Sequence, residues 1–397
     1  MHERPTPVSA LSTGAGSGAL RRSRVFRARL AWAAGLVALV QLAAVASPVA
    51  SRSASGEWSQ ERIARLVEEM PARMRAHRVP GVTVVLVARG AVSWSGGFGV
   101  TGAGEVVTAD TVFQVASLGK PVFARLVELL AEERAWPLDE PLARWVGRES
   151  PVAPSELLAT TSAADLLAHR SGLSFDEAAD RIVFDPDARG GWRYSGAGYG
   201  VLQRAVEAAT GETLEELARE HLFDELDLDS MSFLPADPGG HAVGHDRSGR
   251  ALPGTAWKMA NAGSSLSSSA LDYARFLLHI SPSVSPSVGS TGGSRGQGGE
   301  WPRVLEPLAT VDAALGLAWG LGWALELDGA GAGPPTAFHW GSNPGFKSFA
   351  LIDFHRGLGL VILTNGDHGL ELIEGMVAIL DEEPHPLFGF YMLHPDD

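Results

Sequence analysis

The chain of 397 residues is 45% hydrophobic and 20% charged, enough apolar content for a large buried core in one or two compact units. It has no cysteine, which excludes disulfides, thiolate metal sites, a cysteine nucleophile and a lipid-modified cysteine anchor. The formal net charge is −14, and without residues 1–56 the remaining 25 basic and 45 acidic residues give about −20. A body that acidic repels phosphate backbones and anionic lipids, so we expect no nucleic-acid partner.

The N-terminal residues predict export. Residues 1–29 are small, polar and basic, and we expect them to be disordered; their last nine positions include five arginines. An apolar run then extends from Leu30 to Ala46, and Ala44-Val-Ala46 matches the small-x-small pattern of a cleavage site. The run is slightly short for a spanning helix, yet an uncleaved anchor remains open. Residues 30–50 are therefore predicted to be a signal peptide or signal anchor. The body is then extracytoplasmic, periplasmic or secreted, and any membrane contact is through residues 30–46.

The body begins near Glu57 with a helix and a hairpin. Apolar residues recur at helical spacing through about His77, and a kink is expected at Pro71. Residues 82–87 are β-branched and apolar, and residues 92–100 alternate as the returning strand. Two later stretches are rich in helix formers, namely 117–135 and 199–228.

Strand patterns return in the last quarter of the chain. Residues 281–300 are low in complexity, rich in Ser, Pro and Gly, and predict a surface loop. Three strands are then expected, at 317–327, 346–353 and 358–365. A final helix is expected at 370–380.

Strands thus open and close the body, and helices lie between them. This order predicts an α/β (α+β) fold, with a mainly antiparallel sheet flanked by helices and a mostly helical insertion at about 115–260. We assign residues 57–383 to this domain and residues 384–397 to a C-terminal tail.

Ser117 and Lys120 are the candidate nucleophile and base. Their spacing at the start of a helix puts both side chains on one face, a turn apart. A serine hydroxyl becomes a nucleophile when a neighbouring amine of lowered pKa accepts its proton, and S-x-x-K is the sequence form of that pair. The plain alternative is a helix start with Ser117 as the cap and Lys120 in solvent.

Other patterns carry weaker signals. Gly292-Gly-Ser294-Arg-Gly296 matches the G-x-S-x-G nucleophile elbow in letters, but neither a strand nor a helix flanks it. His241 and His245 lie in a Pro/Gly-rich loop without a nearby acidic pair, so no metal site is expected. Three acidic residues are expected to be exposed at strand ends or turns: Glu326, Asp353 and Asp367.

Three further segments favour a catalytic interpretation of Ser117. Tyr194 lies in a Gly-rich turn before a helix, and a phenol near a lysine can relay a proton; a core tyrosine is the alternative. The segment 338–346 places His339 at a strand start among glycines that a substrate could approach. His169 belongs to a loop that follows a helix.

In this order, Ser117-x-x-Lys120, Tyr194-Ser-Gly196 and His339-Trp-Gly341 resemble the active-site elements of the class C β-lactamase-related serine hydrolases. That superfamily includes penicillin-binding DD-peptidases and esterases with the β-lactamase fold. The resemblance extends from about residue 60 to 380. Supporting segments are Val79-Pro-Gly81-Val, Leu166-Leu-Ala-His169-Arg-Ser-Gly-Leu173, Gly263-Ser-Ser-Leu266 and Trp319-Gly-Leu-Gly-Trp323.

The resemblance implies roles for these positions. Ser117 would be acylated, Lys120 would accept or relay its proton, and Tyr194 would pass the proton to the leaving group and later activate water. Backbone N–H groups of Ser117 and of Ser342, which follows Gly341, would bind the oxyanion. His339 occupies the position of a lysine in many members.

Two departures from the pattern concern the substrate. Gly196 stands where β-lactamases and DD-peptidases usually have an asparagine, and Trp340 replaces a small hydroxyl residue. We expect both to disfavour bicyclic lactams and to favour smaller or flatter acyl groups.

The sequence therefore predicts an exported serine hydrolase that cleaves ester or amide bonds through a Ser117 acyl-enzyme, with an esterase-like preference. One alternative is a β-lactamase or D-alanyl-D-alanine carboxypeptidase, and another is a non-hydrolysing receptor or scaffold of the same fold. We expect a monomer without cofactor or metal that acts on a small ester, amide or peptide.

Overall fold

The computed structural model describes residues 56–102, 104–176, 181–235, 241–254, 257–280, 302–327 and 333–394. The expected basic segment 1–29, the signal segment 30–50 and the loop 281–300 with Ser294 lie outside these ranges. Within the described ranges, no helix is both long enough and apolar enough to cross a membrane.

The elements in chain order are α1 (Gln60–His77), β1 (Gly81–Ala88), β2 (Ala91–Gly99), β3 (Val112–Gln114), the 3-10 turn η1 (Ala116–Leu118), α2 (Gly119–Arg134), α3 (Ala143–Val146), α4 (Ser155–Thr160), α5 (Ala163–Leu167), β4 (Leu173–Asp176), β5 (Arg181–Phe184), η2 (Pro186–Ala188), α6 (Gly196–Thr210), α7 (Leu214–Ala218), η3 (Arg219–Phe223), β6 (Ser267–Ser269), α8 (Ala270–Ile280), η4 (Arg303–Leu305), β7 (Ala309–Asp312), β8 (Leu317–Trp319), β9 (Ala324–Glu326), β10 (Thr336–Asn343), β11 (Phe346–Asp353), β12 (Leu358–Thr364), α9 (Gly369–Leu380), η5 (Pro386–Gly389) and η6 (Tyr391–Leu393).

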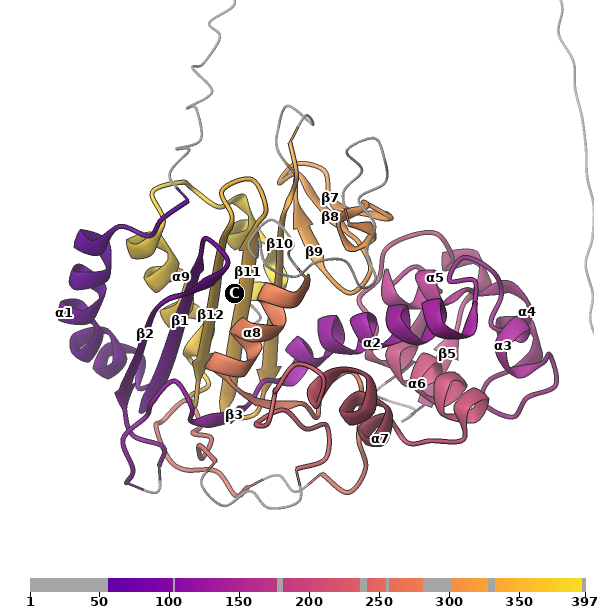
Figure 1. Cartoon of the computed structure of the whole chain (residues 1–397), viewed down its shortest axis with the longest axis horizontal. Coiled ribbons are helices and arrows are strands. Elements are labelled where there is room, and N and C mark those ends of the chain that lie inside the picture. The colour runs from indigo at the N-terminus through magenta and orange to yellow at the C-terminus, as the bar shows by residue number, and fades with distance from the viewer. Residues whose placement is uncertain are drawn as a thin grey trace, which may run out of the picture. The chain divides into compact units, whose positions relative to one another are not determined.

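An 8-stranded sheet in the order β2-β1-β12-β11-β10-β9-β8-β7 organises the fold. Its strand pairs are antiparallel, and β1 pairs with β12 from the other end of the body. The central strands β1, β11 and β12 are buried along their whole length and mostly apolar, because both faces of the sheet are covered. Helices α1 and α9 pack on one face and α8 on the other, as Figure 1 shows. The expected mainly antiparallel sheet flanked by helices is confirmed.

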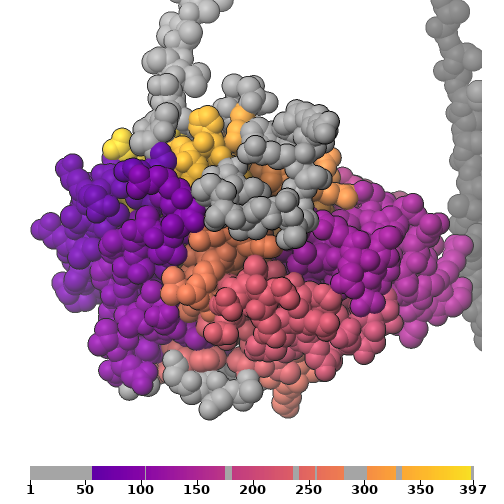
Figure 2. Space-filling view, in the orientation of Figure 1, coloured from indigo at the N-terminus to yellow at the C-terminus, as the bar shows by residue number. Residues whose placement is uncertain are grey.

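The helices α2 to α7 form a second region between β3 and β6, together with the hairpin β4-β5. In the space-filling view, α8 in orange lies between the indigo part of the sheet region and the pink and magenta helical region (Figure 2). The candidate nucleophile, Ser117, lies on η1 and the candidate base, Lys120, lies on α2, where the chain passes from β3 into the helices.

Two predicted elements are divided in the structure. The helix expected at 199–228 ends at Thr210, because Gly211 adopts a left-handed backbone (φ 84°) that ends the helix. A capping box at Thr213 then starts α7. The strand expected at 317–327 is two strands, β8 and β9, which pair with each other across a turn at Gly322 (φ 79°).

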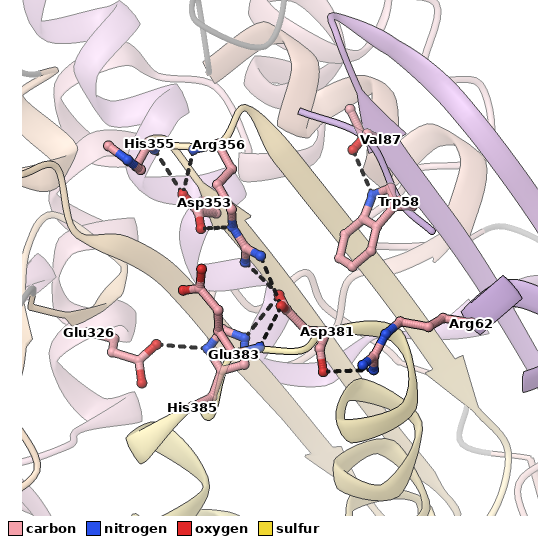
Figure 3. Close-up of polar contacts among 10 residues, drawn as sticks. All are labelled: Trp58, Arg62, Val87, Glu326, Asp353, His355, Arg356, Asp381, Glu383 and His385. Atoms are coloured by element: carbon pink, nitrogen blue, oxygen red, sulfur yellow. Dashed lines mark hydrogen bonds and ion pairs between the residues drawn. The ribbon is translucent and has the colours of Figure 1, made fainter. Parts of the chain in front are cut away.

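The expected exposure of Glu326 and Asp353 is wrong. Both are buried in an ion cluster that we define as Glu326, Asp353, Arg356, Asp381 and His385 (Figure 3). Arg356 donates to Asp353 Oδ2 (2.6 Å) and to both carboxylate oxygens of Asp381 (2.9 and 2.5 Å). His385 contacts Glu326 Oε2 at 2.9 Å and Asp381 Oδ2 at 3.3 Å. The cluster joins β9, the β11-β12 turn and the end of α9.

This ion cluster is charged despite its burial. Burial alone would lower the pKa of His385, but hydrogen bonds and charges from Asp381 and Glu326 outweigh it and raise that pKa to about 9. Burial would raise the pKa of Asp381, but hydrogen bonds from His385 and Arg356 hold it well below its usual range.

The residues assigned to a tail pack on the body. Leu387, Phe390 and Leu393, on η5 and η6, are buried in the same apolar layer as α1 and α9. Asp367, also expected to be exposed, is partly buried; it accepts from Lys347 Nζ at 2.8 Å and from the backbone N–H of Gly345 at 2.7 Å.

Candidate active site

Ser117 lies on the tight turn η1, two residues before α2 begins at Gly119, rather than on the helix predicted at 117–135. The turn follows β3 directly, and the buried Ala116 adopts a left-handed backbone (φ 52°) that an alanine adopts only with strain. The side chain of Ser117 remains partly exposed. This bend presents the Ser117 hydroxyl at the junction of the sheet and the helical region.

Lys120 is 2% exposed, which rules out the alternative of a solvated lysine beside a serine cap. Its Nζ donates to Ser117 Oγ at 2.9 Å and to the Gly263 carbonyl at 2.7 Å. Ser117 Oγ also donates to the Gly263 carbonyl, at 3.3 Å. None of the ion pairs in the described part of the chain includes Lys120. Burial without a carboxylate lowers its pKa to about 7, so a large share is neutral near neutral pH.

Tyr194 lies beside this pair, in the extended segment before α6. Lys120 Nζ lies 4.9 Å from the centroid of the Tyr194 ring. The Tyr194 hydroxyl is buried and has no hydrogen-bond partner among the described residues. Burial raises the pKa of Tyr194, and the Ser117 hydroxyl acts in the opposite direction. Tyr194 therefore keeps its proton at physiological pH.

Strand β10 packs directly on the backbone of the nucleophile turn. A Cβ on Gly341 would lie 2.2 Å from the Val115 carbonyl oxygen and 2.2 Å from Ser348 Oγ, so only glycine fits. Ser348 Oγ in turn donates to the Val115 carbonyl at 2.8 Å. Ser342, the next residue on β10, is exposed. The two proposed oxyanion donors, Ser117 and Ser342, thus lie on segments in direct contact.

His339 and Trp340 are buried behind Tyr194, not on an open surface. His339 Nδ1 lies 2.7 Å from the Trp340 carbonyl oxygen, an acceptor, so Nδ1 carries the proton and Nε2 is bare. Burial and the Lys120 charge lower the pKa of His339 to about 3. Trp340 is 4% exposed and stacks on Tyr194 with 5.6 Å between ring centroids. The expected crowding of a lactam by Trp340 is therefore not supported; the indole contacts Tyr194 instead.

Gly196 is exposed at the first position of α6, and a Cβ there would meet nothing within 4 Å. The position therefore has room for the asparagine that the resemblance leads one to expect.

Three residues near the site carry contacts that sequence reasoning did not assign. The Gly263 carbonyl accepts from both Ser117 and Lys120. Asn343 Nδ2 donates to Gln114 Oε1 at 3.2 Å and to the Ser264 carbonyl at 3.1 Å, which ties β10 to the segments beside Ser117. The ring of His169 packs on Tyr194. The segments around Gly263 and His169 were noted as similar to the family, but only the folded chain shows their contacts.

His245, in the loop before β6, makes a hydrogen bond to the backbone. His245 is buried, and its Nδ1 lies 3.0 Å from the Asn365 carbonyl oxygen. Among the described residues there is no group of three His, Cys, Asp or Glu side chains that could hold a metal.

The chain belongs to the β-lactamase family: the family model described as Beta-lactamase matches residues 63–379. Two curated proteins are similar over most of the body. Penicillin-binding protein 4 of Amycolatopsis lactamdurans is 28% identical over 327 residues, covering 75% of this chain and 84% of that protein. Esterase EstB of Burkholderia gladioli is 26% identical over 367 residues, covering 76% and 90%.

Solved structures agree on the fold. An octameric penicillin-binding protein homologue from Pyrococcus abyssi superposes with a TM-score of 0.65 at 18% identity, covering 84% of this chain and 80% of that one. The D-alanine carboxypeptidase AmpC from Burkholderia cenocepacia gives 0.61 at 18% identity, covering 80% and 99%. The fold is thus that of the β-lactamases and penicillin-binding proteins.

Proposed function

We propose that this protein is an exported hydrolase that cleaves ester or amide bonds through an acyl-enzyme on Ser117, with a preference for esters. One observation carries the proposal: a buried Lys120 without a carboxylate partner lies 2.9 Å from a partly exposed serine hydroxyl. A lysine in that state is a base, because burial lowers its pKa to about 7.

In the acylation step, neutral Lys120 accepts the proton of Ser117, and Oγ attacks the carbonyl carbon of the substrate. The electron pair of the carbonyl bond moves to the oxygen, and the backbone N–H groups of Ser117 and Ser342 stabilise the resulting oxyanion. Fixed backbone donors need no reorganisation as charge develops, and loss of one such donor typically costs ~100-fold or more in rate.

Tyr194 serves as the proton donor to the leaving group. Its raised pKa keeps the hydroxyl protonated, and Lys120, 4.9 Å from the ring centroid, carries the proton taken from Ser117. When the carbon–leaving-group bond breaks, Tyr194 gives its proton to the departing atom and regains one from Lys120. Water then attacks the acyl-enzyme through the same relay in reverse.

The ester preference rests on Gly196 and on the similarity to Esterase EstB. An exposed glycine provides no side-chain amide to orient a peptide or lactam, whereas an activated ester needs only the nucleophile and two donors. The similarity to Penicillin-binding protein 4 favours the alternative, a β-lactamase or D-alanyl-D-alanine carboxypeptidase. A non-hydrolysing receptor is the remaining alternative.

The proposed cellular setting rests on the five arginines of residues 21–29 and the apolar segment 30–50 that follows them, a pattern that supports export by a signal peptide or anchor. The partner is then a small ester, amide or peptide outside the cytoplasm, and the enzyme acts as a monomer. Each step of the scheme uses side chains and backbone groups of this chain alone.

The test compares kcat/KM for p-nitrophenyl butyrate and for a chromogenic cephalosporin, with Ser117→Ala as the control. We expect rapid cleavage of the ester, slow cleavage of the cephalosporin, and neither in the control. A preference for the cephalosporin would favour the lactamase alternative. Absence of a Ser117 adduct after treatment with a fluorophosphonate, read by intact-protein mass spectrometry, would favour the receptor.

A further inference from the structure

We propose that His169 is a positioning residue that holds Tyr194 in place for proton transfer to the leaving group. The proposal rests on the function proposed above, in which Tyr194 is the donor, and it adds a residue to which no role was assigned. It follows from contacts that His169 makes on both sides of Tyr194 and on its ring.

Both backbone neighbours of Tyr194 donate to His169. The N–H of Arg193 donates to the His169 carbonyl at 2.9 Å, and the N–H of Ser195 donates to His169 Nδ1 at 3.1 Å. Between these two bonds, the His169 ring packs on the Tyr194 ring with 4.4 Å between centroids and a 39° tilt. His169 therefore contacts Tyr194 itself and the residues immediately before and after it.

Tyr194 depends on these contacts because its hydroxyl is not anchored. Among the described residues that hydroxyl makes no hydrogen bond of normal geometry, although the Ser117 hydroxyl lies close enough to affect its pKa, so its position depends on ring packing and backbone bonds. The Tyr194 ring also stacks on Trp340, with 5.6 Å between ring centroids. Such stacking does not fix the position of the ring within its own plane. The two hydrogen bonds to His169 are directional, and they fix where the Tyr194 Cα lies.

His169 is itself held firmly. It follows α5, is 1% exposed, and adopts a left-handed backbone (φ 56°), which histidine and asparagine enter more readily than most residues. Trp319 packs edge-on against its ring at 4.8 Å, and Tyr199 lies at 5.2 Å. This backbone conformation turns both the carbonyl and the ring of His169 toward the Tyr194 segment.

The protonation state of His169 fits a positioning role. Because Nδ1 accepts from the Ser195 N–H, Nδ1 is bare and the proton lies on Nε2. Burial lowers the pKa of His169 well below its usual value, and the charges of Lys120 and His339 act in the same direction. The ring therefore stays neutral, so Nδ1 remains an acceptor and does not compete with Lys120 as a base.

The experiment uses two substitutions and two leaving groups. His169→Phe keeps an aromatic ring and removes the acceptor, whereas His169→Asn keeps an acceptor close to Nδ1 and suits the left-handed backbone. Ethyl butyrate needs its alkoxide protonated, and p-nitrophenyl butyrate does not. For His169→Phe we expect kcat/KM to fall about 100-fold for the ethyl ester, the loss typical of a shift of about 1 Å. The p-nitrophenyl ester should change little, and His169→Asn should restore most of the loss.

The double variant separates positioning from general destabilisation. In a Tyr194→Phe background, His169→Phe should cost almost nothing more, because the donor it positions is already absent. Equal losses on both esters, no rescue by asparagine, or full additivity with Tyr194→Phe would overturn the proposal. If Tyr194→Phe is itself not selective for the ethyl ester, the proposed function of Tyr194 fails instead.

A measurement on the wild-type protein covers the case in which His169→Phe does not fold. Nitrogen-15 NMR of histidine-labelled protein should show His169 with a bare Nδ1 and a protonated Nε2, unchanged down to about pH 5. A proton on Nδ1 would exclude the Ser195 bond and with it the proposal.

Discussion

Two buried groups of titratable side chains in the described part of the protein differ in charge: burial favours the neutral forms around Ser117, whereas the ion cluster is charged. Around Ser117, burial lowers the pKa of Lys120 to about 7, so a large share of this proposed base is neutral near neutral pH, and keeps His339 neutral, with a pKa of about 3. In the ion cluster, the side chain of His385 is also buried (3% exposed), yet its pKa is about 9. Two histidines with the same usual pKa of 6.5 thus lie on opposite sides of it.

The difference is the presence of carboxylates, not the degree of burial. His385 contacts Glu326 and Asp381, whose negative charges stabilise its cation. Lys120 contacts the Gly263 carbonyl and the Tyr194 ring, and His339 contacts the Trp340 carbonyl; neither has an ion pair with a carboxylate among the described residues. Burial favours the neutral form unless an opposite charge is buried with the group. One fold can therefore hold one buried histidine charged and another neutral, and the surroundings that keep His339 neutral also lower the pKa of Lys120, the proposed base.

Removal of the proposed nucleophile, Ser117, should have the largest effect on activity. Ser117→Ala should abolish measurable turnover, while Lys120→Ala or Tyr194→Phe should each cost about 10²- to 10⁴-fold, the scale of lost acid–base help. These losses should not multiply, because the residues act as a unit. Steady-state kinetics on ethyl butyrate, whose leaving group needs protonation, checks this, with Ser294→Ala as the control. If Ser117→Ala stays active and Ser294→Ala does not, the assignment is wrong.

Removal of the cation from the ion cluster should be the next largest effect, on stability. Arg356→Met leaves the carboxylates of Asp353 and Asp381 buried without their main partner, which typically costs about 3–5 kcal/mol. The control is Arg65→Met, which breaks an exposed pair with Glu69 and should cost less than about 1 kcal/mol. Urea unfolding followed by circular dichroism measures both. Equal losses would show that the cluster is not a clamp.

The charged histidine should also make stability depend on pH. The raised pKa of His385 in the folded state means that its contribution is complete below pH 6.5 and is lost as pH rises toward 9. His385→Gln should therefore destabilise the protein by about 3 kcal/mol at pH 6 and by much less at pH 9.5. Unfolding of both proteins at a series of pH values checks the slope. A difference that grows with pH would contradict it.

A carboxylate placed beside Lys120 should stabilise the charged form of this lysine, as the carboxylates of the ion cluster do for His385. A Cβ on Gly263 would lie 3.5 Å from Lys120 Nζ, so Gly263→Asp puts a negative charge within reach of the amine. The pKa of Lys120 should rise by about one to two units, and activity at pH 7 should fall about 5- to 50-fold relative to Gly263→Asn. The loss should shrink as pH increases, because the base works only when deprotonated. Identical pH profiles for the two variants would count against a lysine base.

The smallest effect concerns the substrate. Gly196→Asn has free space for its side chain and should help lactams selectively by about 1 kcal/mol, the value of one hydrogen bond. Gly196→Ala is the control for the added Cβ. The ratio of kcat/KM for a chromogenic cephalosporin and p-nitrophenyl butyrate measures the gain. If this ratio does not change, Gly196 does not determine the substrate preference.

The two groups also differ in how far the sequence could predict them. The contact of Ser117 with Lys120 follows from local spacing, and the long apolar strands from their residue types. Asp353 and Glu326 look like surface charges in the sequence, because their partners Arg356, Asp381 and His385 come together only when β9, β11 and α9 are assembled.

Tertiary contacts explain the other misses. The sequence of β10 does not show which face of the sheet Trp340 occupies. Only its stacking on Tyr194 shows that the indole is buried. His169 has no motif that announces a contact with Arg193 and Ser195, since both bonds depend on its left-handed backbone. Such a conformation at a non-glycine residue is not visible in the sequence.

The central claim is that burial makes Lys120 a neutral base for Ser117. The most direct measurement is the rate of Ser117 labelling by a fluorophosphonate as a function of pH, in wild type and in Lys120→Ala. We expect the wild-type rate to rise with pH and level off above an inflection near 7, the pKa of Lys120. The Lys120→Ala rate should be lower and lack that inflection. A wild-type rate that continues to rise past pH 9, or the same inflection in Lys120→Ala, would contradict the claim.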